Sequence, residues 1–209
     1  MTMLAYVDDV SHLPHTYVSV DLEGTGTFGS KNDIVELAVI LVKDGKICDP
    51  KIWMFKPKHG ITSRGTKIHG ISNDDVRNCP YIEGHVEEIR QYLDEIPYVG
   101  HCVGTDISLL KNSLKDWKPK QIFDTYRIAR KAYTNLPLGY KLKDLCTKFN
   151  LESEITAGTR RLFQQYPRQL SGFHTAGCDA LACMTLIEHI RLDVRKDYNL
   201  VARQQKLML

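Results

Sequence analysis

The sequence predicts an α/β fold in which a central mixed five-stranded sheet, an antiparallel meander plus parallel strands, is flanked by helices. Two observations predict it: three β-type segments open the chain, and short strands then alternate with helical segments. The 209 residues are 43% hydrophobic, which is enough to bury one substantial core. We expect one domain at residues 16–192, between an N-terminal extension (1–15) and a C-terminal tail (193–209).

Three segments predict the antiparallel part of the sheet. Thr16–Asp21 alternates apolar and polar side chains, and Asp33–Val42 is rich in β-branched residues. The dipeptide Asp44-Gly45 favours a tight turn into a third strand, Lys46–Phe55.

A change of pattern after these strands predicts alternating helices and strands. Ser72, before a run of Asn and Asp, indicates a helix start, and Ile82–Leu93 has apolar spacing near ~3.6 residues. Pro97–Gly100 predicts a short strand. The isoleucine and leucines between residues 107 and 114 fit a helix after that strand.

The last third of the chain predicts one more strand and several helices. Gln121–Phe123 is the strand, and Asp124 is placed to cap the helix that follows it. Lys141–Phe149 and Ala176–Ile190 are two further helices. The stretch between them, Glu152–Phe173, is expected to be a surface loop.

Composition excludes a membrane protein and a disulfide-rich one. No apolar run approaches the ~18 residues that cross a bilayer, and Asp8 and Asp9 lie where a signal peptide needs an apolar core. We therefore expect a soluble, intracellular, cytoplasmic protein without a membrane partner. The cysteines form no C-x-x-C pair, which argues against a zinc site and favours reduced, mostly buried thiols.

Acidic residues at predicted strand ends suggest a metal site. Asp21 and Glu23 are two residues apart at the end of a strand, so both side chains project from the same face. Hard divalent cations take oxygen ligands, and the following Gly24-Thr25-Gly26 permits close approach of a substrate to the backbone. An exposed acidic strand end is the alternative interpretation.

Three further residues are candidates for the same site. Asp106 follows the Pro97–Gly100 strand, where it either joins the carboxylates or caps a helix. His174 and Asp179 would point roughly 140° apart on a regular helix. Both reach one site only if Asp179 is on the helix and His174 is in the loop before it; a histidine capping that turn is the alternative.

Three sequence motifs carry a family resemblance. VDLEGTG (Val20–Gly26), GHCVGTD (Gly100–Asp106) and HTAGCDA (His174–Ala180) resemble, in order and spacing, the motifs of the DEDDh or DnaQ-like 3′-5′ exonucleases of the ribonuclease-H-like superfamily. IHGI at Ile68–Ile71, FDTYRIAR after Ile122 and LKDLCTKFNL after Lys141 fall where that family has counterparts. The resemblance spans roughly residues 16 to 192.

The resemblance implies a reaction and a role for each motif residue. A member would release nucleoside 5′-monophosphates from the 3′ end of DNA or RNA. Two divalent cations, Mg²⁺ or Mn²⁺, would be held by four carboxylates, and His174 would be the general base. The carboxylates are Asp21, Glu23, Asp106 and Asp179.

The resemblance also implies a pocket for the terminal nucleotide. It would be lined by Gly24, Thr25, His69 and Ile71, with Ile71 wedged against a base. An ordinary turn with a buried isoleucine is the alternative. The second motif departs from the family, because Cys102 and Thr105 replace the usual Asn and Phe; this bears on substrate preference.

Partners and rival functions remain open at this level. From Lys111 to Arg168 there are thirteen Lys or Arg and five Asp or Glu, which fits either a phosphate-binding track or a solvated basic face. The stretch Glu152–Phe173 carries cationic and aromatic residues able to hold single-stranded nucleic acid: Arg160, Arg161, Phe163, Tyr166 and Arg168. A noncatalytic binding or adaptor module and an endonuclease on the same sheet are the rival functions.

Two partner contacts are suggested only faintly. The C-terminal RQQKLML, with Gln204, Leu207 and Leu209, echoes peptides that dock on sliding clamps, as a clamp or polymerase contact would require. A fraying amphipathic helix end is the alternative. A homodimer is left open, since many small relatives of the family dimerise.

Overall fold

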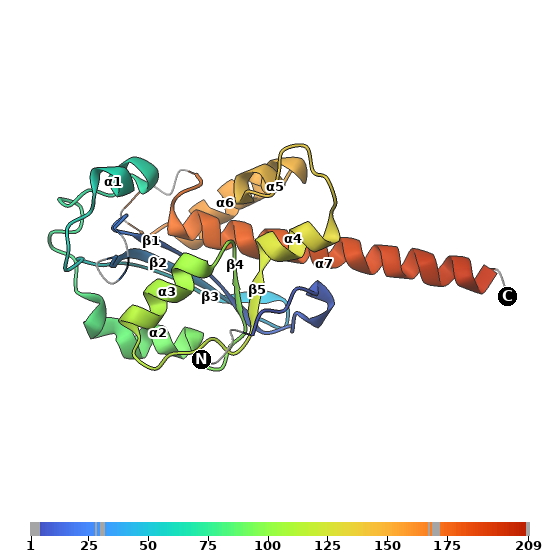
Figure 1. The fold of residues 1–209 in the computed structure, drawn as a ribbon, viewed down its shortest axis with the longest axis horizontal. Coiled ribbons are helices and arrows are strands. Elements are labelled where there is room, and N and C mark those ends of the chain that lie inside the picture. The colour runs from blue at the N-terminus through green and yellow to red at the C-terminus, as the bar shows by residue number, and fades with distance from the viewer. Residues whose placement is uncertain (1–4, 28, 30–31, 167, 169–171, 208–209) are drawn as a thin grey trace.

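Five strands form one mixed sheet in the order β3-β2-β1-β4-β5 in a computed structural model, which describes residues 5–27, 29, 32–166, 168 and 172–207 (Figure 1). β1 to β3 pair antiparallel, whereas β4 is parallel to β1 and β5 is parallel to β4. The predicted meander followed by parallel strands is therefore confirmed. The strands are β1 (Tyr17–Gly24), β2 (Ile34–Lys43), β3 (Lys46–Met54), β4 (Tyr98–Gly100) and β5 (Ile122–Asp124).

Helices cover both faces of the sheet (Figure 1). On one face α2 (Val86–Leu93) and α3 (Gly104–Ser113) pack over a core that includes Val20, Leu37 and Leu110. On the other face the long helix α7 crosses β1 and β2, with three shorter helices beside it. These helices are α4 (Thr125–Ala132), α5 (Leu142–Lys148), α6 (Glu152–Leu162) and α7 (Ala176–Leu207).

Strand alternation decides which side chains of β1 face α7. Val18, Val20 and Leu22 belong to the core under α2 and α3. Ser19 points the other way, because its hydroxyl donates a 2.8 Å hydrogen bond to the carbonyl of Ala180 on α7. Asp21 and Glu23 continue the Ser19 face, so the same alternation that builds the core directs both carboxylates towards α7.

The predicted helix start at Ser72 is wrong. The N–H and hydroxyl of Ser72 both bond to the Asp75 carboxylate, at 2.7 and 2.6 Å, and this local bonding closes a turn instead of a helix. A helix lies earlier, at α1 (Ser63–His69). It is capped by the Thr62 hydroxyl and ended by Gly70, whose φ of 74° needs no Cβ.

The expectation of a surface loop over Glu152–Phe173 is wrong for its first half, which forms α6. Ile155, Gly158 and Thr159 are the buried face of this helix. A Cβ on Gly158 would come within 2.7 Å of the Leu181 side chain, so the glycine allows α6 to lie close against α7. A glycine and a threonine on the buried face of this helix hide its amphipathic pattern from sequence reasoning.

The two ends of the chain are partly built into the fold. The N-terminal extension adds a bridge from Tyr6 to Ile122, and Val10 and Leu13 are buried in the core under α7. α7 continues as helix to Leu207, well past the predicted end at Ile190. The side chains of Gln204 and Leu207, and all of Leu209, lie outside the described residues, so the clamp-peptide hypothesis stays a prediction.

The structure also tests the predictions about membrane helices and cysteines. No helix in the described part of the chain is long and apolar enough to cross a membrane. All six cysteines are free thiols, as expected, but only Cys146, Cys178 and Cys183 are buried, whereas Cys48 and Cys102 are exposed. The expectation that most of the thiols are buried is therefore wrong, because only three of the six are.

Candidate active site

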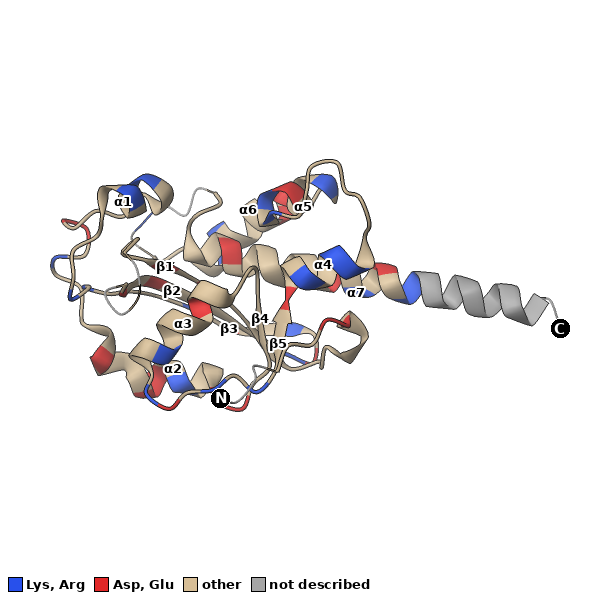
Figure 2. Cartoon of the chain, in the orientation of Figure 1, with Lys and Arg blue, Asp and Glu red and all other residues tan. Residues whose placement is uncertain are grey.

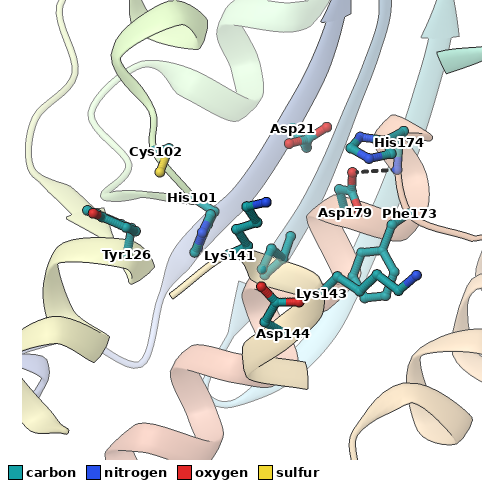
Figure 3. Close-up of a pocket in the computed structure, with 11 residues that line it drawn as sticks. Asp21, His101, Cys102, Tyr126, Lys141, Lys143, Asp144, Phe173, His174 and Asp179 are labelled. Carbon is teal, nitrogen blue, oxygen red and sulfur yellow. Dashed lines mark hydrogen bonds between the residues drawn. The ribbon is translucent and has the colours of Figure 1, made fainter. Parts of the chain in front are cut away.

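Carboxylates from both ends of the chain meet where β1 ends under the start of α7. Asp21, Glu23 and Asp179 each offer an oxygen atom, and these atoms lie within 4.8 Å of one another. Figure 3 shows Asp21 beside Asp179, with the His174 ring next to both. The structure therefore brings three of the four predicted carboxylates to one point.

An irregular entry into α7 places His174 and Asp179 together. His174 precedes the helix with φ of 68°, and its backbone N–H donates a 2.9 Å hydrogen bond to Oδ2 of Asp179 in the first turn. This is the arrangement that the sequence required for both side chains to reach one site. The other Asp179 oxygen, Oδ1, is buried and has no hydrogen-bond donor among the described residues.

Asp106 lies beside this group rather than within it. It occupies the first turn of α3 and is outside the 4.8 Å set, yet its charge contributes to raising the pKa of both Asp21 and Glu23. The Asp124 carboxylate shapes the approach to α3 by accepting the N–H groups of Cys102 and Val103, at 3.0 and 3.3 Å. It also caps α4, as predicted.

Burial and mutual repulsion raise the pKa of every carboxyl group in the cluster. Desolvation is the largest cause for each, followed for Asp21 and Glu23 by the charge of Asp179. The pKa of Glu23 rises to about 8, those of Asp106 and Asp179 rise to about 7, and that of Asp21 lies well above its usual range. Buried, mutually repelling oxygens, one without a donor, fit a hard divalent cation.

Glu36 is a fifth carboxylate that sequence reasoning missed. It pairs across the strands with Glu23 and is fully buried. One of its oxygens accepts the Tyr166 hydroxyl at 3.0 Å and Nη1 of Arg168 at 2.9 Å, and the other accepts the N–H of Ala176 at 2.8 Å. A charged residue inside the apolar strand IVELAVILV was the signal that could have identified it.

Arg168 connects this buried carboxylate to α1. While Nη1 pairs with Glu36, Nη2 donates to the carbonyl of His69. Glu36 therefore ties together β2, the end of α1 and the segment that leads to His174. The hypothesis that Arg168 serves as a free nucleic-acid contact does not fit this buried pairing.

The residues expected to line a nucleotide pocket lie at the end of β1, mostly buried. Ile71 N–H donates to Nδ1 of His69 at 3.1 Å, which leaves Nε2–H to donate to the Gly24 carbonyl at 3.2 Å. Thr25 is buried and its hydroxyl accepts the N–H of Asp33. The Ile71 side chain is fully buried in a small apolar cluster, which matches the alternative of a turn around a buried isoleucine.

A cavity of about 470 Å³ adjoins the carboxylates on the side of α4 and α5 (Figure 3). Several of its lining residues were not singled out from the sequence, because they become neighbours only when α5 packs beside α7. The lining comprises Asp21, His101, Cys102, Tyr126, Lys141, Leu142, Lys143, Asp144, Phe173, His174 and Asp179.

The mixed sheet, the helices on its two faces and the carboxylates at a strand end form the arrangement that the ribonuclease-H-like resemblance implies. Exonuclease X in complex with 5′ overhanging duplex DNA has a similar fold, with a TM-score of 0.53, 24% identity, and coverage of 81% of this chain and 89% of that chain. E. coli Exonuclease I in complex with a 5cy-dA13 oligonucleotide has a TM-score of 0.64 and 17% identity, and the match covers 93% of this chain and 45% of that chain. The predicted fold class is confirmed.

Residues 18–156 match the Exonuclease family of the RNase T type, and the chain belongs to this family. DNA polymerase III subunit epsilon of Aquifex aeolicus is 30% identical over 145 residues, which are 68% of this chain and 71% of that protein. The 3′-5′ exonuclease DinG of Staphylococcus aureus is 28% identical over 134 residues, but the match covers only 15% of its length. The DnaQ-like resemblance and the exonuclease class are thereby confirmed.

Proposed function

We propose that this chain is a divalent-metal-dependent 3′-5′ exonuclease that releases nucleoside 5′-monophosphates from a nucleic-acid 3′ end. The observation that carries the proposal is the gathering of Asp21, Glu23 and Asp179 oxygens within 4.8 Å, with one Asp179 oxygen that receives no donor from the described part of the chain. The family match includes Asp21, Glu23 and Asp106 but ends at residue 156. The roles of His174 and Asp179 therefore rest on their geometry and on the motif.

The four carboxylates, Asp106 included, would hold two cations, Mg²⁺ or Mn²⁺. When bound, such cations supply Lewis-acid activation of water and neutralise charge on the scissile phosphate. Burial, and after it the repulsion between the acidic groups, raises the pKa of Glu23 to about 8 and those of Asp106 and Asp179 to about 7. Cation binding would relieve this repulsion. The chain's contribution is a set of oxygens fixed by β1, α3 and α7.

His174 is the proposed general base. Its side chain is exposed at the cavity while its backbone is anchored to Asp179, so the ring is held beside the carboxylates yet open to water. An imidazole can take the proton of the attacking water. Water then adds to phosphorus, the bond to the 3′-oxygen of the penultimate nucleotide breaks, and that oxygen is protonated by solvent.

Gly24 and Thr25 are proposed to contact the terminal nucleotide through their backbone. His69 would support them from behind, since its ring bonds the Gly24 carbonyl and its own backbone is bonded by Arg168. The names and titles of the relatives refer to DNA, so DNA is the substrate to test first, with RNA in parallel.

The decisive experiment digests matched DNA and RNA oligonucleotides, labelled at the 5′ end, with Mg²⁺ and with Mn²⁺. We expect stepwise shortening from the 3′ end with release of mononucleotides, and no shortening with Asp21→Ala. Internal fragments would indicate an endonuclease. A folded wild-type protein that binds the oligonucleotide but releases nothing with either metal would favour a noncatalytic binding module.

A further inference from the structure

The cavity beside α4 and α5 is distinct from the proposed terminal-nucleotide side of the site. It shares Asp21, His174 and Asp179 with the carboxylate cluster, yet its lining includes none of Gly24, Thr25, His69 or Ile71. The catalytic groups thus have one neighbour region on each side. A volume of about 470 Å³ lies within the ~300–1,000 Å³ range of sites that hold a small ligand.

The far wall of the cavity is cationic and aromatic. Lys141 and Lys143, at the start of α5, are exposed, and within the described part of the chain neither forms an ion pair. Tyr126 of α4 and Phe173 are half-buried and add two rings to the lining. Asp144 is the one carboxylate on this wall. In Figure 2 Lys and Arg positions lie on α4, whereas α5 and α6 carry both basic and acidic positions.

This chemistry fits a nucleotide unit with its phosphate. Ammonium groups attract phosphate oxygens independently of sequence, and aromatic rings stack on any base. The chemistry of the reaction supplies the location: a strand whose terminal nucleotide lies against Gly24 must continue, across the scissile phosphate, on the opposite side of the carboxylates. The cavity adjoins Asp21, His174 and Asp179 but is not lined by Gly24, so it offers space for that continuation.

Resting on the proposed function, we propose that this cavity binds the nucleotide on the 5′ side of the scissile phosphate. Lys141 and Lys143 contact the next phosphate of the strand, and Tyr126 or Phe173 stacks on the base. The enzyme then recognises a strand rather than a single terminal nucleotide. Its affinity depends on a phosphate that does not react.

The test compares two substrates that differ only in this upstream unit. Thymidine 5′-phosphate p-nitrophenyl ester has the terminal nucleotide and the scissile phosphate, but nitrophenol replaces the upstream strand. A short oligo(dT) has both. We expect K141Q/K143Q to raise KM for oligo(dT) by about 10-fold and to reduce the slope of log affinity against log salt by about 1 to 2, because each lost phosphate contact removes about one unit.

K141Q/K143Q should keep the wild-type kcat and KM for the nitrophenyl ester. Its kcat for oligo(dT) should also remain that of the wild type. The matched control is K46Q/K51Q, which removes two lysines from β3 at the other edge of the sheet and should change neither substrate. D144N should lower KM for oligo(dT), since it removes a charge that repels phosphate.

Several results would overturn the inference. One is a K141Q/K143Q variant that loses kcat/KM equally on oligo(dT) and on the nitrophenyl ester. Another is a variant whose KM is unchanged for both substrates. If the wild type cleaves neither substrate, the proposed function fails. The strand site is then judged separately by fluorescence anisotropy of labelled oligo(dT), where K141Q/K143Q must weaken binding and K46Q/K51Q must not.

Discussion

The two sides of the carboxylate cluster differ in how firmly the chain is packed. Towards α1, Thr25, His69 and Ile71 are each less than 5% exposed, and the His69 ring is hydrogen-bonded to the Gly24 carbonyl and to the N–H of Ile71. Towards α5, the exposed Lys141 and Lys143 lie at the wall of an open cavity. A region fixed before binding can hold one nucleotide in one geometry, whereas an open charged region accepts strands of any sequence. We call the region of Thr25, His69 and Ile71 the closed side and the cavity with Lys141 and Lys143 the open side. The comparison predicts that the closed side governs turnover and that the open side governs affinity for the strand.

Removing a carboxylate that both sides share should have the largest effect. We expect Asp21→Ala to lower kcat by at least about 10³-fold, because cation binding and phosphate positioning are lost together. Mononucleotide release from a labelled oligonucleotide measures this, with the exposed Glu87→Gln as a control of equal charge change. Substantial activity in Asp21→Ala would show that the cations are held elsewhere.

Removing the base should separate chemistry from strand binding. His174→Ala is expected to lower kcat by about 10²- to 10⁴-fold while oligonucleotide affinity stays close to that of the wild type. Single-turnover rates and anisotropy, measured side by side, distinguish the two quantities. Full activity with ample metal would remove His174 from the role of base.

Breaking the closed side should cost stability as well as turnover. Arg168→Ala leaves Glu36 buried without its cation, and we expect the free energy of unfolding to fall by ~3 kcal/mol. kcat should fall more than affinity, because the loosened segment carries His174. Urea unfolding and steady-state kinetics measure the two effects.

Arg160 and Arg161 provide the matched comparison for Arg168. Both are exposed on α6, and replacing them should change stability by no more than ~0.5 kcal/mol. A variant Arg168→Ala as stable as these would mean that the ion pair does not hold the closed side together. If substitution of Arg160 and Arg161 weakens the salt dependence of binding, these residues contact the phosphates of the strand, and α6 is then part of the open side.

The smallest expected effect is a pH dependence of stability without metal. The carboxyl pKa values are raised in the folded state, so the folded protein holds more protons than the unfolded chain and loses stability as pH rises through about 7 to 8. In a chelator, Tm should fall by a few degrees between about pH 6.5 and pH 8.5, since ~1 kcal/mol shifts Tm by ~2–4 °C in a domain this size.

Mg²⁺ should reverse this fall, because cations replace the lost protons among the carboxylates. Differential scanning fluorimetry with and without Mg²⁺ is sufficient, and Asp179→Asn should flatten the profile. A Tm that rises over this pH range in chelator would contradict the assigned direction of the pKa shifts.

The sequence predicted those features that a local pattern encodes. Alternation along β1 put Asp21 and Glu23 on one face, and the glycines around His174 anticipated an irregular entry into α7. The order of the strands followed from the meander and the later alternation of strands and helices. These features depend on neighbouring residues and on the periodicity of each element.

The remaining features depend on contacts between distant segments. The role of Glu36 arises from Arg168 and Ala176, which lie 132 and 140 residues later in the chain. α6 escaped prediction because its packing face uses a glycine against Leu181. The wall with Lys141 and Lys143 exists only where α5 packs near Phe173, a placement that no local pattern specifies.

The covering of β1 by α7 makes the proposed site depend on a segment that is synthesised much later than β1. Tyr17 donates to Glu188 and Ser19 donates to Ala180, pairs separated by 171 and 161 residues, so β1 is covered only after α7 has been synthesised. A nascent polypeptide that stops before residue 176 has neither Asp179 nor a cover for Tyr17. A ribosome-bound fragment that stops there lacks one of the carboxylates that the proposed cation site requires.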